Sequence, residues 1–253
     1  MPKAVEKFWK VWYNKMLIDA TNKDYRTLNE EIRKTTECQI IHSLGQRFIG
    51  AGMKTQRIKM KGIPGNALGA YLAGAEIEVD GNAQDAVGDT MNDGKIVVHG
   101  NIGDALGYAM RGGKILVRGN AGYRVGIHMK EYHDKKPQII IGGKCGSFLG
   151  EYQAGGIIVV LGLSEDGKPI VGNFPCTGMH GGKMFLRGSV EEIRFPHTVT
   201  IRKATDNDLS EIIPLIDEFC ELFHFEKTEI LSEPFWLVAP DTKNPYKQMY
   251  VAN

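Results

Sequence analysis

Residue types that could carry catalysis are scattered through this sequence of 253 residues. The four cysteines, Cys38, Cys145, Cys176 and Cys220, lie far apart, and none belongs to a C-x-x-C pair. This spacing supports neither a disulfide framework nor a zinc or iron–sulfur cassette. Cys145 and Cys176 lie in glycine-rich turns, where we expect small packing residues rather than nucleophiles. The sequence also lacks the G-x-S-x-G pattern of a serine nucleophile elbow.

The polar insertion 128–137 is the best candidate for metal chemistry. It carries His128 and His133 together with Glu131 and Asp134. Zinc sites need imidazole, thiolate or carboxylate ligands at a few recurrent spacings, and this insertion matches none of them. We therefore expect a solvated loop that projects from the fold, and we predict no metal site.

Three carboxylates, Asp85, Asp89 and Asp104, lie at offsets of 4 and 19 residues. Carboxylates gathered on one face would suit glycoside chemistry, in which one acts as an acid and another as a base or nucleophile. However, Asp85 and Asp104 hold the same place in successive copies of a repeat. We therefore expect a solvated ladder of side chains instead of an active site.

Glycine-rich chains also invite a nucleotide-binding interpretation. The sequence has no G-x-G-x-x-G placed between a strand and a helix, and no G-x-x-x-x-G-K-[ST]; Gly143-Lys144-Cys145 comes nearest. His99 and Arg118 occupy equivalent places in successive repeats, so we expect them to be outward strand residues. We predict no catalytic, cofactor-binding or metal-binding residue in this chain.

The glycines instead follow a period of nineteen residues. An apolar row keeps the same step, from Ile58 through Ile115, and then continues at Ile139 after a step of 24. Steps longer than nineteen indicate loop insertions within a stacked repeat. Most copies read G-x-x-G-x-x-x-G, and one copy has Gln84 at the second place. The repeat glycines are Gly50, Gly62, Gly65, Gly69, Gly81, Gly88, Gly100, Gly103, Gly107, Gly119, Gly122, Gly126, Gly143, Gly146 and Gly150.

Each glycine-rich half is followed by a short alternating strand. Alternation with period two places the apolar residues on one face, and stacking of successive turns aligns like side chains about 4.8 Å apart. Leucine-rich and calcium-binding repeats need consensus residues that are missing here. The sequence predicts a mainly β fold: a single-stranded right-handed parallel β-helix of about seven 19-residue rungs, with helical N- and C-terminal flanks.

We expect three regions: an N-terminal helical flank (1–37), a parallel β-helix (38–195), and a C-terminal helix with a proline-rich tail (196–253). An open β-helix end presents unpaired strand edges, so flanking helices that cover the ends are the simplest expectation. The tail contains Trp236 and Tyr246 among prolines. It could dock on a partner or lie along the β-helix, and we favour the second.

The flanks carry recognisable helix signals. Residues 24–37 read as one helix, with Asp24 or Thr27 as the N-cap. Residues 206–223 read as a second helix with a wide apolar stripe. Pro214 lies within it and is expected to kink the helix or shift its start.

Net charge is +1, which gives no case for binding nucleic acid or an anionic membrane. The first twenty residues mix charged and aromatic types without a continuous apolar run, so we expect neither a signal peptide nor a membrane span. A cytoplasmic protein is the default expectation.

The stretch from Gly62 to Gly162 resembles the C-terminal GXGXG β-helix domain of the glutamate synthase large (alpha) subunit. The resemblance rests on the G-x-x-G-x-x-x-G copies, on GGKILVRGNAGYRVGI and on GEYQAGGIIVVLG. In that family the domain holds no catalytic residue and packs between an ammonia-releasing and an ammonia-using domain. Neither of those domains is recognisable here, and the chain opens with Met1-Pro2 rather than a nucleophilic cysteine.

The resemblance implies a split enzyme in which this chain is a non-catalytic structural subunit. Its partners would be a class II glutamine amidotransferase subunit and a synthase subunit that carries FMN and an iron–sulfur centre, so this chain would hold no cofactor. The complex would convert glutamine, 2-oxoglutarate and reductant to two glutamates. The chain could also form a homo-oligomer. Two alternative functions stay open: the equivalent subunit of a formylmethanofuran dehydrogenase-like complex, and an independent carbohydrate-active β-helix protein.

Overall fold

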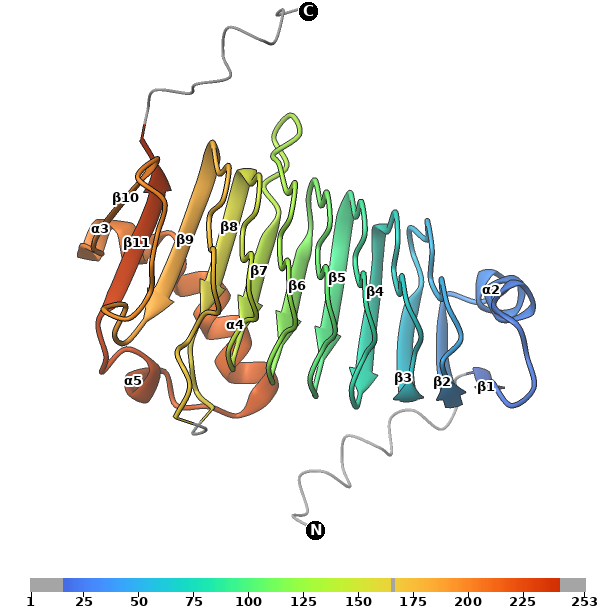
Figure 1. Ribbon diagram of the computed structural model, residues 1–253. Coiled ribbons are helices and arrows are strands. Elements are labelled where there is room, and N and C mark those ends of the chain that lie inside the picture. Colours follow the sequence, from blue (N-terminus) through green and yellow to red (C-terminus); the bar gives the residue numbers. More distant parts are fainter. Residues whose placement is uncertain (1–15, 165–166, 242–253) are drawn as a thin grey trace, which may run out of the picture.

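A computed structural model describes residues 16–164 and 167–241, and it confirms the parallel β-helix (Figure 1). Eleven strands form one sheet in the order β1-β2-β3-β4-β5-β6-β7-β8-β9-β11-β10. The strands are β1 (Met16–Asp19), β2 (Glu37–Leu44), β3 (Arg57–Ile63), β4 (Ala73–Asp80), β5 (Asp93–Val98), β6 (Lys114–Val117), β7 (Gln138–Ile141), β8 (Ala154–Val160), β9 (Gly181–Arg187), β10 (Val199–Lys203) and β11 (Phe235–Pro240). The helices are α2 (Tyr25–Arg33), α3 (Asp206–Ser210), α4 (Ile213–Phe223) and α5 (Lys227–Ile230).

The nineteen-residue step is the register of the sheet. Ile77 pairs with Ile96 and Ile96 with Ile115, each in parallel, so the apolar row of the sequence is a column of stacked side chains. The three isoleucines are at most 1% exposed and belong to one continuous core inside the coil. The solenoid has about eight turns, close to the expected seven.

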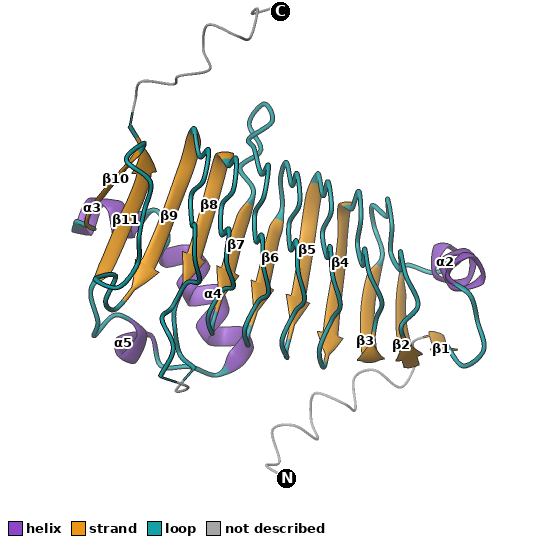
Figure 2. Cartoon of the chain, viewed as in Figure 1, coloured by secondary structure: helices purple, strands orange, loops and turns teal. Residues whose placement is uncertain are grey.

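The outer face of the sheet changes character along the stack. One outward row begins with Lys59 and Glu78, which are partly exposed, and continues in register through apolar residues that are at most 3% exposed. These apolar residues are Val97, Leu116, Ile140, Val159 and Phe185. They form a second core with α4, which lies across the outer face of the C-terminal half of the sheet (Figure 2).

This position of α4 corrects the expectation that the C-terminal helix caps the end of the coil. The apolar row from Val97 to Phe185 needs a cover because burying it removes hydrocarbon from water. The predicted single helix is also wrong: α3 ends at Ser210, and α4 begins at Ile213 with Pro214 in its first turn. A proline is tolerated there because the first-turn amides have no partner within the helix.

Strands β11 and β10 close the C-terminal end. β11 pairs antiparallel with β9 and β10, which ends the parallel stack. Trp236 donates from Nε1 to the carbonyl of Gly188 at 2.8 Å. This part of the tail lies along the β-helix, as favoured from the sequence, whereas Tyr246 falls outside the described residues. Within those residues, no helix is long and apolar enough to cross a membrane.

At the opposite end, α2 covers the first rungs (Figure 1). Asp24 caps it by accepting the amide of Thr27, as one of the two predicted caps. Leu28 and Ile32 enter the central core. The helix ends at Arg33, four residues before the predicted Glu37. It ends early because β2 begins at Glu37 and pairs with β3.

Candidate functional site

Six of the repeat glycines lie at one corner of the coil, which we call the left-handed corner. Each rung there has three alternate residues at positive φ, for example Ala86 (56°), Gly88 (68°) and Thr90 (51°). The central residues of successive rungs are Gly50, Gly69, Gly88, Gly107, Gly126, Gly150 and Cys176. Cys176, with φ 59°, therefore holds the central position that glycine holds in the other rungs. This position of Cys176 was not predicted from the sequence.

Amides of this corner bind the rungs in both directions. Ala86 and Thr90 donate to the carbonyls of Asp104 and Tyr108 in the next rung, both at 2.7 Å, while Gly88 donates back to Leu68 at 2.9 Å. Alternating left-handed residues turn successive N–H groups toward opposite neighbours. Few of the corner's backbone groups are left unpaired, which makes the edge of the stack rigid.

Two rows that the sequence showed separately turn out to interlock. A Cβ on Gly88 would lie 2.5 Å from Cδ1 of Ile115, which stands in the following rung. The same relation joins Gly50 to Ile77 and Gly126 to Ile158. Each glycine at the centre of the corner therefore leaves room for an isoleucine of a following rung, or for Met184 in the case of Gly150, so a side chain there would displace the core.

Other repeat glycines lie where successive backbones approach closely. A Cβ on Gly100 would overlap Oδ1 of Asn82, and one on Gly103 would overlap Oδ1 of Asp85. These oxygens accept amides from the rung above: Asn82 from Asn101 at 2.7 Å, and Asp85 from Asp104 at 2.9 Å. Glycine admits this ladder of side-chain oxygens because it has no Cβ.

The predicted carboxylate ladder is therefore present, and its geometry is structural. Asp104 passes the pattern on by accepting the amide of Tyr123 at 2.8 Å. Asp89 accepts the hydroxyl of Thr90 at 2.8 Å. Asp85 and Asp104 lie one rung apart, and each holds the next rung in place. This arrangement gives no support to a glycosidase-type acid and base.

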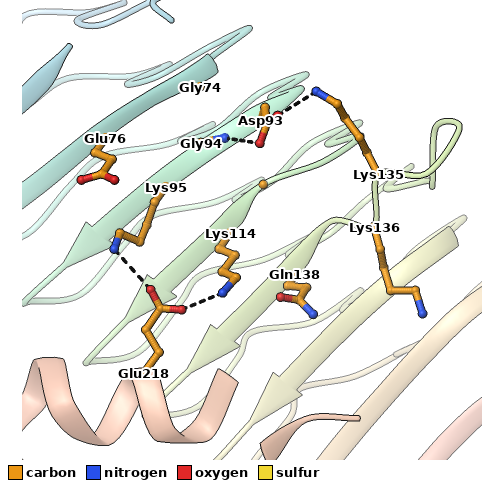
Figure 3. A pocket seen from close by; sticks show the side chains of 11 residues that line it. Gly74, Glu76, Asp93, Gly94, Lys95, Lys114, Lys135, Lys136, Gln138 and Glu218 are labelled. Atoms are coloured by element: carbon orange, nitrogen blue, oxygen red, sulfur yellow. Dashed lines mark hydrogen bonds and ion pairs between the residues drawn. The ribbon is translucent and has the colours of Figure 1, made fainter. Parts of the chain in front are cut away.

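A shallow groove of about 430 Å³ lies between α4 and the outer face of β5 to β7 (Figure 3). Glu218 of α4 points toward the sheet and binds Lys114 at 2.8 Å and Lys95 at 3.3 Å. Lys135 reaches back to Asp93 at 2.8 Å across the groove rim. Basic residues of the sheet and acidic residues of the helix thus meet in pairs.

These pairs set the electrostatics of the groove. Partial burial would raise the pKa of Glu218, but Lys114 and Lys95 outweigh it and lower the pKa. Burial and two lysines act in the same way on Glu211, whose pKa is also lowered. The hydrogen bond from Lys135 lowers the pKa of Asp93. Carboxylates held in the charged form by ammonium groups are suited to docking a helix and poorly suited to general acid catalysis.

The remaining candidates are packing residues. Burial raises the pKa of Cys145, and raises that of Cys176 to about 12, so neither is a nucleophile at neutral pH. His128 stacks on Tyr152 with ring centres 5.2 Å apart, while His133 packs against Tyr132. Across the described residues, no three histidine, cysteine or acidic side chains converge on a metal position.

The two expected outward residues do point outward, toward the C-terminal segment. His99 lies 3.0 Å from Glu78 and packs edge-on against Phe223, and Arg118 lies over the ring of Phe225. The sequence reading missed that this face would be covered. Its signal was available: strands from β5 onward lose their alternation and become almost wholly apolar.

Comparison with known proteins shows similarity to a protein family, to a relative in another organism and to a solved structure. A family model described as GXGXG motif matches residues 14–241. A protein of Methanocaldococcus jannaschii described as uncharacterized is 42% identical over 250 residues, covering 93% of this chain and 96% of the relative. A chain in the crystal structure of the formyltransferase/hydrolase complex FhcABCD from Methylorubrum extorquens, in complex with methylofuran, has a TM-score of 0.60 and 20% identity. That match covers 86% of this chain and 88% of the other, and it supports the fold alone.

Proposed function

This chain belongs to the GXGXG motif family, and we propose that it is a non-catalytic scaffold subunit of a multi-subunit enzyme complex. The observation that carries the proposal is the interlocked corner, in which Gly88 leaves room for Ile115 and neighbouring amides bind both adjacent rungs. Eight strands at the spacing of paired strands form a stiff body roughly 35 Å long. Such a body can hold two partner chains at a fixed separation.

The chemistry of the described residues agrees with a supporting role. The groove under α4 carries paired charges, with Glu218 between two lysines, and the buried thiols are held protonated. A reaction would need a nucleophile or base that is free to change its protonation state. The proposal therefore places catalysis in other subunits.

The finer proposal is a glutamate synthase-type complex. The partners would be a class II glutamine amidotransferase subunit and a synthase subunit with FMN and an iron–sulfur centre, both cofactors lying outside this chain. The scaffold would fix the distance between the two active sites so that ammonia passes from one to the other. The family match supports this choice, because it covers the same glycine repeat on which the resemblance to glutamate synthase rests.

A second candidate is the equivalent subunit of a formylmethanofuran dehydrogenase-like complex. The observation that favours it is the shared fold with a chain of the formyltransferase/hydrolase complex, over most of both chains. The two candidates make the same use of the β-helix and differ in their partners. Flavin with iron–sulfur in the purified assembly favours the first, whereas a molybdopterin or tungsten protein favours the second.

The test compares coupled and uncoupled reactions. The two partner chains are purified with and without this chain, and glutamate formation is measured from glutamine and, separately, from ammonium. We expect loss of this chain to lower the glutamine-dependent rate while the ammonium-dependent rate is retained. Glutamine hydrolysis by this chain alone, or binding of one FMN per chain, would overturn the proposal.

A further inference from the structure

Exposed aromatic side chains gather on the left-handed corner over four consecutive rungs. Tyr108 is 40% exposed, Tyr123 54%, Tyr152 41% and Phe174 63%. Surface aromatics of this size are ordinary singly, but a contiguous group is a mark of an interaction surface. The group, which we call the aromatic ridge, consists of Tyr108, Tyr123, His128, Phe148, Tyr152 and Phe174.

The rings of the ridge are ordered by contacts with one another. His128 and Tyr152 stack with ring centres 5.2 Å apart and planes 6° apart, and Tyr108 meets His128 edge-on. Phe148 and Phe174 stack at 5.4 Å. Stacking covers one face of each ring in these two pairs. A sugar or a nucleobase needs an open ring face, so the ridge is better suited to a protein surface.

The repeat itself provides a control for the role of these aromatics. Phe148 and Phe174 each precede the central corner residue by two positions, with φ of 63° and 59°. The equivalent residues of the five earlier rungs are Phe48, Arg124 and three alanines with φ of 62°, 56° and 56°, namely Ala67, Ala86 and Ala105. The fold therefore does not require an aromatic here, and positive φ disfavours bulky side chains. Phe48, at the same place in the first rung, meets Tyr25 of α2 edge-on, so an aromatic here can bind a segment outside the corner.

Carboxylates lie beside the ridge in its first rung, at Asp104, and in the rung before it, at Asp85 and Asp89. Asp104 accepts the amide of Tyr123, and Thr90, next to Asp89, donates its amide to the carbonyl of Tyr108, so acidic and aromatic columns are continuous. Over the part of the chain that the structure describes, no ion pair reaches Asp85, Asp89 or Asp104. The one cation inside the ridge, Arg124, pairs with Glu151 at 3.1 Å. The surface is thus apolar at one end and acidic at the other.

We infer that the aromatic ridge, with Asp85, Asp89 and Asp104, is the docking surface for a partner subunit. The contacting face of that partner carries apolar side chains opposite the rings and lysine or arginine opposite the carboxylates. Aromatic centres bordered by charge are typical of protein interfaces, and complementary charge fixes their orientation. The acidic flank would repel nucleic acid. The inference rests on the proposed function, because it needs a partner chain.

The first test is zero-length crosslinking of the native assembly. The assembly is purified through a tag on this chain, treated with a carbodiimide that joins carboxylates to lysines, and analysed by peptide mass spectrometry. We expect crosslinks from Asp89 or Asp104 to lysines of another subunit. Crosslinks from these residues only to another copy of this chain would overturn the inference, as would partner crosslinks confined to other faces.

The second test uses substitutions that the repeat already contains. The double variant Phe148→Ala/Phe174→Ala introduces, at both positions, the alanine that Ala105 provides at the equivalent place of an earlier rung. We expect at least tenfold weaker binding of the purified partner with an unchanged melting temperature. Asp104→Asn keeps the ladder acceptor and should reduce the salt dependence of binding. Leu44→Ala, at a 78% exposed residue near the N-terminal end, is the control and should bind normally.

The outcomes separate the two proposals. If the wild-type chain is recovered without any other subunit, the scaffold function itself fails. If wild type, Phe148→Ala/Phe174→Ala and Asp104→Asn all retain an identified partner equally, the scaffold function stands and the docking surface is wrong.

Discussion

The side chain of Ile115 fills the space that a Cβ on Gly88 would need, with only 2.5 Å between the two positions. The same relation recurs up the stack, because each corner glycine is followed 27 or more residues later by a large apolar residue. The glycine column and the isoleucine column are therefore one packing device. A stack built this way resists bending, since any shift of one rung would press a side chain into the next.

Substitution of Gly88 by alanine tests this packing directly. We expect a loss of about 2–4 kcal/mol in the free energy of unfolding, from positive φ and from overpacking against Ile115. Gly52→Ala is the matched control, since Gly52 has φ +66° but open space around its Cβ position. It should cost about 1–2 kcal/mol, from positive φ alone. Equal losses in the two variants, measured by urea unfolding, would contradict the interlock.

Replacement of Glu218 by glutamine tests the docking of α4. The variant loses the ion pairs to Lys95 and Lys114, and the two ammonium groups then face each other without a counter-charge. We expect about 1 kcal/mol of destabilisation, the order found for partly exposed pairs. Hydrogen exchange in α4 should rise selectively. Glu221→Gln, at an exposed position of the same helix, should change neither quantity.

Stability should fall in acid for a reason that the structure identifies. The hydrogen bond from His99 lowers the pKa of Glu78 to about 2; partial burial opposes the shift and Lys59 adds to it. A carboxylate whose pKa is lowered by folding stabilises the folded state above its unfolded pKa near 4.5. That contribution is lost as pH falls toward 2.

We therefore expect the melting temperature to drop between pH 4.5 and 2, and to drop less in Glu78→Gln. Thermal unfolding followed by circular dichroism across this range measures both slopes. Parallel curves for wild type and Glu78→Gln would show that this carboxylate does not contribute.

Thiol labelling checks the packing roles of the cysteines. Cys38, Cys145 and Cys176 are buried, and burial raises the pKa of each thiol. A maleimide at neutral pH should label only Cys220 in the folded protein and all four thiols after unfolding. Rapid native labelling at Cys176 would mean that the last glycine-column position is open to solvent.

Much of the fold could be predicted from the sequence because the repeat is local and exact in phase. The isoleucine row predicted the register, and the spacing of Asp85 and Asp104 predicted a ladder. The destination of α4 was missed, because a helix stripe states that a face is buried without saying against what. The outward row from Val97 to Phe185 indicated where a helix would pack, because these strands are apolar on both faces. The aromatic ridge was missed because its rings are far apart in sequence.

The composition of the native assembly tests the central claim most directly. The chain is tagged in its native cells, purified gently, and weighed intact by native mass spectrometry, with the subunits identified by peptide sequencing. We expect a stoichiometric complex in which this chain is joined by at least one cofactor-bearing enzyme subunit. Recovery of the chain as a lone monomer, or as a homo-oligomer only, would contradict it.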